Sequence, residues 1–148
     1  MADKTTQTIY IDADPVTVMD VIADIGSYPE WVAEYKTAEV LETDAQGNPK
    51  TARMVLDAGA IKDNYVLEYD WKIAEDGTGS VSWHLVRATL LKGLNGSYTL
   101  APVAAGTKVT YDLEVELTMP MIGLLKRKAE RRLTDTALKD LKKRAEAE

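Results

Sequence analysis

The sequence predicts an α+β fold in which a curved, seven-stranded antiparallel sheet wraps around one long C-terminal helix, with two short helices after the first strand. Three observations favour this fold. Apolar and polar residues alternate through most of the middle of the chain, as in strands with one buried face. Short turn signals separate these segments, which predicts consecutive antiparallel hairpins. The C-terminal segment instead carries apolar residues at helical spacing.

The first predicted strand covers residues 5–11, which alternate. Asp14 and Pro15 then predict a helix start, because an N-cap followed by proline at the first helical position is a favoured combination. Ser27 predicts the cap of a second, short helix over residues 28–32. Both helices therefore precede the main run of strands.

Six further strands are expected, and glycine- or proline-containing turns separate most of them. Gly96, within one of them, indicates a β-bulge or a close approach of another group. The six strands are expected at residues 35–43, 50–58, 63–73, 79–88, 90–101 and 106–118.

The C-terminal helix is expected to begin at Pro120, with an apolar stripe behind Ile122 and Leu125. This stripe and the apolar sheet face should cover each other. A strongly twisted sheet would curl around the helix, which predicts a cavity between them. The residues expected to continue the stripe are Ala129, Leu133, Ala137 and Leu141.

Composition limits the possible chemistry. A length of 148 residues predicts one domain over 1–148 that needs no disulfide or metal for stability. The chain has no cysteine and one histidine, His84, which excludes thiol chemistry and multi-histidine metal sites within one chain, so we expect no metal and no cofactor. It has seven tyrosines, three tryptophans and no phenylalanine, so every aromatic ring carries a polar group.

The charge is acidic overall and uneven. A net charge of −6 argues against nucleic acid as a partner. Residues 121–148 hold nine Lys/Arg and five Asp/Glu, a balance of +4, so the last helix presents either a solvated face or an interaction surface. The polar first ten residues predict no signal peptide, and no apolar run approaches the ~20 residues of a membrane span. A cytoplasmic location is expected.

Alternation along the strands places six aromatic residues on the helix-facing side, where they form either the core or the wall of a cavity. Arg87 shares that face at the end of its strand, where it reaches the rim, pairs with an acid or contacts a ligand. His84 has outward parity, and most carboxylates are expected on the solvent face. The six aromatic residues are Tyr65, Tyr69, Trp71, Trp83, Tyr98 and Tyr111.

Two further features of the expected cavity each have two interpretations. Trp31, in the second short helix, either caps the core or gates entry. Residues 119–125 form the most apolar run and precede Lys126, Arg127 and Lys128. This run is either the floor of the cavity or an apolar tip with a basic collar that contacts a membrane surface.

The order of the elements, with the segments ADIGSYPEW (23–31), GSYTL (96–100) and GTKVTY (106–111), resembles the SRPBCC superfamily, the START-like or helix-grip fold. The chain is most similar to small actinobacterial members described as polyketide cyclase/dehydrase-like or lipid-transport-like. The resemblance implies a deep, mostly apolar pocket between sheet and helix. The chain lacks the two histidines of the oxygenase branch, and residues 44–49 hold one glycine where the plant allergen branch has a glycine-rich loop.

These observations predict binding, with transport as its extension, of a hydrophobic small molecule such as a lipid, quinone or polyketide. One alternative is a polyketide cyclase/dehydratase that acts by pocket shape and by carbonyl polarisation from Arg87 and a tyrosine. A second is a macromolecular interaction module acting through the basic helix. No catalytic residue is assigned, and the oligomeric state stays open. The residues predicted to line the cavity are Trp31, Met54, Tyr65, Tyr69, Trp83, Leu85, Arg87, Tyr98, Met121 and Leu125.

Overall fold

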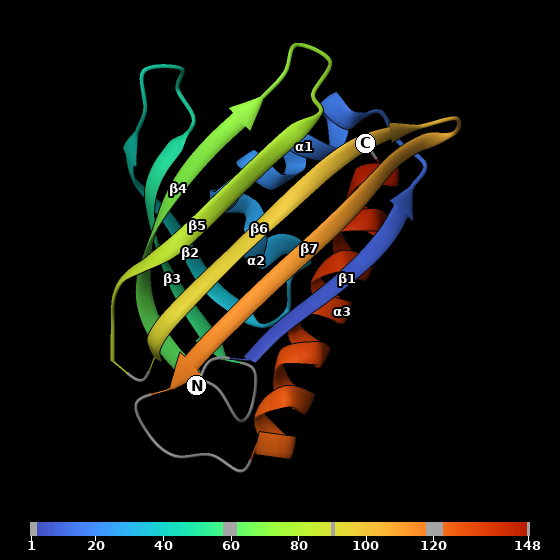
Figure 1. The fold of residues 1–148 in the computed structure, drawn as a ribbon. Coiled ribbons are helices and arrows are strands. Elements are labelled where there is room, and N and C mark those ends of the chain that lie inside the picture. The colour runs from blue at the N-terminus through green and yellow to red at the C-terminus, as the bar shows by residue number, and fades with distance from the viewer. Residues whose placement is uncertain (1–2, 58–61, 90, 118–122, 148) are drawn as a thin grey trace.

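The computed structural model describes residues 3–57, 62–89, 91–117 and 123–147 (Figure 1). Side chains at positions 3, 4, 117, 123–130 and 133 lie outside this description. The elements follow the predicted order. They are β1 (Asp3–Ile11), α1 (Pro15–Ala23), a 3₁₀ turn (Ile25–Ser27), α2 (Tyr28–Trp31), β2 (Tyr35–Thr43), β3 (Pro49–Asp57), β4 (Lys62–Ile73), β5 (Gly79–Ala88), β6 (Leu91–Val103), β7 (Gly106–Leu117) and α3 (Gly123–Ala147).

The seven strands form one antiparallel sheet in the order β1-β7-β6-β5-β4-β3-β2. After β1 the chain passes through the short helices to the far edge at β2. It then returns strand by strand to β7, which pairs with β1. Figure 1 shows the sheet curving, with α3 running along the β1 edge and the short helices closing one end. The predicted α+β helix-grip architecture is therefore confirmed.

Helix α3 is tied to β1 by hydrogen bonds along its length. The Gln7 side chain donates to the Thr134 hydroxyl at 2.8 Å and to the Arg131 carbonyl at 3.3 Å. Further along, the Lys142 ammonium donates to the Tyr10 carbonyl at 3.0 Å. The helix is thereby held in one position over the sheet edge. None of the helices in the described ranges is long and apolar enough to cross a membrane.

The buried stripe of α3 includes the described part of the predicted one and adds further residues. Leu141 is fully buried as expected, and Ala137 is half-buried. A four-residue repeat drifts around a helix of 3.6 residues per turn, so the real stripe alternates steps of four and three. Pro120 and Ile122 lie outside the described residues, as do the side chains of Ala129 and Leu133. The buried residues of the described stripe are Thr134, Leu138, Leu141 and Ala145.

One carboxylate is an exception to the solvent-facing pattern. Asp63 is only 7% exposed, and its carboxylate accepts hydrogen bonds from the backbone N–H groups of Thr89 at 3.1 Å and Leu91 at 2.7 Å. It shares the inward parity of Tyr65, two residues further along β4. Because it accepts these bonds, Asp63 anchors the connection between β5 and β6.

Candidate ligand-binding cavity

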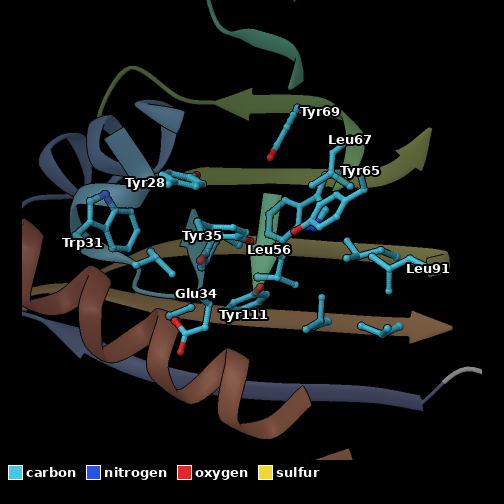
Figure 2. Close-up of a pocket in the computed structure, with 17 residues that line it drawn as sticks. Tyr28, Trp31, Glu34, Tyr35, Leu56, Tyr65, Leu67, Tyr69, Leu91 and Tyr111 are labelled. Carbon is cyan, nitrogen blue, oxygen red and sulfur yellow. The ribbon is translucent and has the colours of Figure 1, made fainter. Parts of the chain in front are cut away.

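A cavity lies between the inner face of the sheet, the segment from α2 to β2, and α3 (Figure 2). Its free volume is about 50 Å³. It is lined by Tyr28, Trp31, Val32, Glu34, Tyr35, Leu56, Tyr65, Leu67, Tyr69, Trp83, Leu91, Leu94, Tyr98, Tyr111, Leu113, Val115 and Ala137.

Aromatic rings make up much of the wall. Six of the seven tyrosines line the cavity, and the seventh, Tyr10, is exposed. One group of rings comes from the strands, where Tyr98 lies 4.6 Å from Tyr111 and 5.3 Å from Trp83, centroid to centroid. A second group comes from α2 and the start of β2, where Tyr28 contacts Trp31 at 5.2 Å and Tyr35 at 5.8 Å.

The position of Trp83 depends on Gly96. The two residues face each other across β5 and β6 with no register shift, so the predicted bulge is absent. A Cβ atom at Gly96 would lie 2.4 Å from the indole ring of Trp83, which is far inside contact distance. Gly96 is therefore the point at which the indole of Trp83 approaches the backbone closely. The missing side chain lets the indole lie across β6 toward the cavity.

The tyrosine hydroxyls that face the cavity are neutral hydrogen-bond donors. Burial raises the pKa of Tyr69, Tyr98 and Tyr111, so all three stay protonated at physiological pH. No other described residue hydrogen-bonds to these three hydroxyls. By contrast, the Tyr35 and Tyr65 hydroxyls bond to each other, and the Tyr28 hydroxyl donates to the Ile22 carbonyl.

Among the described lining residues, Glu34 is the single acid, and none of them is a lysine, arginine or histidine. Its backbone carbonyl accepts a hydrogen bond from the N–H of Asp57 at 2.8 Å, which fixes the start of β2. Its side-chain Oε2 is buried without a hydrogen-bond partner among the described residues, and so is the indole Nε1 of Trp31. Two residues of the cavity wall thus each carry a buried polar atom without a partner among the described residues.

Five of the predicted lining residues lie in the cavity wall: Trp31, Tyr65, Tyr69, Trp83 and Tyr98. Met54 is fully buried in the core without lining the cavity, and Leu85 is half-buried on the same sheet face. Met121 lies outside the described residues, and so does the side chain of Leu125. Ligand binding by any of these residues stays a prediction.

The inward placement of Arg87 is wrong, because β5 contains a bulge. Leu85 pairs with Leu67, but the next pair joins Arg87 to Val66, so β5 has one extra residue at this point. Val86 and Arg87 are consequently both exposed. The register that strict alternation assumes ends before Arg87, and its guanidinium does not reach the cavity.

The solvent face of the sheet holds His84 as expected. Its side chain is 57% exposed and lies 3.4 Å from the Glu68 carboxylate. In the ranges that the structure describes, no group of three or more His, Asp or Glu side chains is placed to hold a metal ion.

Twelve of the 17 lining residues were not on the predicted list. Three of the twelve, Tyr28, Glu34 and Tyr35, had been assigned to no sheet face. They belong to the short α2 helix and to the start of the next strand, where no periodicity extends far enough to assign a face. The tyrosine count was the available signal for Tyr28 and Tyr35. A chain with seven tyrosines and no phenylalanine carries a hydroxyl on each of those rings, which favours a role beyond core packing.

The fold is similar to that of START superfamily proteins. The structure superposes on a START superfamily protein from Mycobacterium smegmatis with a TM-score of 0.87, 20% identity and 97% coverage of both chains. A protein from Thermus thermophilus superposes with a TM-score of 0.84, at 22% identity and with 98% of both chains covered. The Zhui aromatase/cyclase from a Streptomyces species gives 0.81, with 13% identity over 99% of this chain and 94% of that one.

The family model described as polyketide cyclase/dehydrase and lipid transport matches residues 11–142, and the chain belongs to that family. The sequence-based resemblance is therefore confirmed at the level of family and fold. The family description names both a catalytic and a carrier activity, so membership does not choose between them.

Proposed function

We propose that the protein binds, and by binding carries, a hydrophobic small molecule such as a lipid, quinone or polyketide in the cavity beside α3. The observation that carries this proposal is a cavity walled by eight aromatic rings on a fold of the START type. Aromatic and aliphatic walls with a few polar groups are typical of small-molecule sites. Membership of a family described by polyketide and lipid activities supports the same reading.

Binding requires the cavity to widen. A volume of about 50 Å³ holds a few waters at roughly 10–15 Å³ each, whereas sites for larger ligands measure roughly 300–1,000 Å³. Trp31 is the element to move, because it borders both the cavity and an outer groove formed with Asp20, Asp24 and Arg144. Displacing its ring would connect the two spaces, which is the gating role.

Titration with 2-naphthalenemethanol, a neutral planar probe, tests this proposal through the fluorescence of the tryptophans in the wall. Ala137 lines the cavity from α3, so Ala137→Leu should occupy ligand space. We expect saturable quenching in the native protein and an affinity at least about tenfold weaker in Ala137→Leu.

Ala147→Leu supplies the matched control, because it adds the same side chain to an exposed position of the same helix. This variant should bind like the native protein. Absence of saturable binding in the native protein, or equal affinities in both variants, would contradict binding in this cavity.

A second candidate function is cyclisation of a polyketide-like chain. It is favoured by the unpaired, protonated hydroxyls of Tyr69, Tyr98 and Tyr111, which could donate to substrate carbonyl oxygens as charge develops on them. Arg87 takes no part in this version. Aromatic product formed from a poly-β-keto thioester faster than in buffer, and slowed in Tyr98→Phe, would support it; a rate equal to that in buffer contradicts it.

A further inference from the structure

We infer that Glu34 makes the cavity selective for hydrophobic ligands that carry a hydrogen-bond donor, a hydroxyl or an ammonium group, and no negative charge. This inference rests on the proposed function and specifies the ligand class. It assigns to Glu34 the role of a specificity residue at the end of the cavity next to α3, where Figure 2 shows its carboxylate beside the helix.

The first observation is the unpaired Oε2 of Glu34. This atom is removed from solvent and accepts no hydrogen bond from any described residue. A buried polar atom without a partner costs free energy, which a ligand donor would recover. The backbone of Glu34 is held by its bond to Asp57, so the carboxylate is positioned by the fold and not by a side-chain partner.

The second observation is the charge around the cavity. In the part of the wall that the structure describes, Glu34 is the only acid and no side chain is cationic. On the neighbouring helix, burial and the charge of Glu34 raise the pKa of Asp140, while Lys143 acts in the opposite direction. Glu34, together with Asp140 within its electrostatic range, opposes a ligand carboxylate or phosphate buried beside Glu34.

The third observation is the aromatic wall. In the same segment of chain as Glu34, the ring of Tyr28 contacts the rings of both Trp31 and Tyr35. The negative faces of such rings attract ammonium groups, and the oxygen of the Tyr28 hydroxyl, whose proton is donated to Ile22, can still accept a hydrogen bond from an alcohol. Rings and carboxylate therefore favour the same ligand groups and disfavour the same ones.

Three probes that share one ring system separate these groups: 2-naphthalenemethanol, 2-naphthalenemethylamine and 2-naphthoate. Calorimetric titration at neutral pH should give measurable affinity for the alcohol and the amine, and at least about tenfold weaker affinity for the carboxylate. Glu34→Gln keeps the size of the side chain. In this variant the affinity for the amine should fall at least about tenfold, and the affinity for the carboxylate should rise.

Glu39→Gln is the matched control, because Glu39 is an exposed glutamate further along β2. It should leave all three affinities unchanged, and thermal melting should show that both variants are folded. Equal native affinities for the three probes, or a Glu34→Gln profile identical to that of Glu39→Gln, would overturn the role of Glu34 while leaving hydrophobic binding intact. Failure of all three probes to bind the native protein would instead overturn the proposed function itself.

Discussion

Gly96 is the residue whose smallness shapes the cavity wall. Replacing it with alanine puts a Cβ atom 2.4 Å from the indole of Trp83, so the ring or the strand must shift. We expect Gly96→Ala to lower the free energy of unfolding by about 1–3 kcal/mol, the usual cost of overpacking. Denaturant unfolding followed by tryptophan fluorescence measures both this loss and a change in the native emission of Trp83.

Gly93→Ala provides the comparison on the same strand. A Cβ atom there would meet Glu116 at 3.5 Å, an ordinary contact distance. Its native emission should stay unchanged. If the two alanine variants unfold alike and share the native emission, the contact between Trp83 and Gly96 does not determine the ring position.

The sheet face of a single residue was predictable only where its strand keeps a regular register with its neighbours. Alternation placed Tyr65, Tyr69 and Trp83 correctly on the inner face, because it is a local property of the chain. It failed at Arg87, because the bulge in β5 arises from pairing with β4. The role of Glu34 in the cavity wall was not predicted, because this residue lies between α2 and β2, where no repeating pattern of apolar residues assigns a face.

At the scale of elements, the turn between β4 and β5 packs against the start of α1. Gly77, in this turn, has φ +85° and a virtual Cβ only 2.3 Å from the backbone nitrogen of Val16. Gly47, in the turn between β2 and β3, has nearly the same φ, +84°, but open space around it. The two turns differ in close packing and not in backbone conformation.

Alanine at Gly47 and alanine at Gly77 should lower the free energy of unfolding by different amounts. Gly47→Ala should destabilise by about 1–2 kcal/mol from the left-handed backbone alone. Gly77→Ala should add roughly 1–3 kcal/mol of overpacking to that cost. Equilibrium denaturation of both variants measures the difference, and equal losses would show that the contact between the turn and α1 contributes nothing to stability.

Elements were predicted more accurately than their contacts. The expected strands 35–43 and 79–88 coincide with β2 and β5, because turn residues mark their ends directly in the sequence. Leu138 and Ala145, which complete the buried stripe of α3, were not predicted, because the side chains they meet belong to other elements such as β1 and α1. A helix face depends on its neighbours as well as on its own repeat.

At the scale of the whole molecule, the tyrosines in the cavity wall should make the folded protein less stable at alkaline pH. Burial raises the pKa of all six tyrosines in the wall above the ordinary value of 10.0. The unfolded chain therefore releases these protons at lower pH than the folded one. Their contribution to stability is complete below about pH 10 and is lost as pH rises above it.

An alkaline titration checks this expectation. Tyrosinate absorbance from the six residues should appear together with loss of the near-ultraviolet circular dichroism of the folded state. Gradual ionisation of all tyrosines while that signal persists would show that the hydroxyls are open to solvent.

The fold as a whole was predictable because alternation, turns and the family resemblance agree with one another. The cavity volume was not, because it depends on how far the curved sheet and α3 stand apart after every side chain has packed. The sequence indicated that a ring-lined space would exist, and the structure shows how narrow it is.

Intermolecular nuclear Overhauser effects with bound 2-naphthalenemethanol test the central claim, ligand binding inside the cavity, most directly. We predict contacts from the naphthyl protons to the Ala137 methyl group and to the rings of Tyr35 and Tyr111, which line the cavity from different elements. Contacts confined to the outer groove beside Asp20 and Arg144, or to the solvent face around His84, would contradict it.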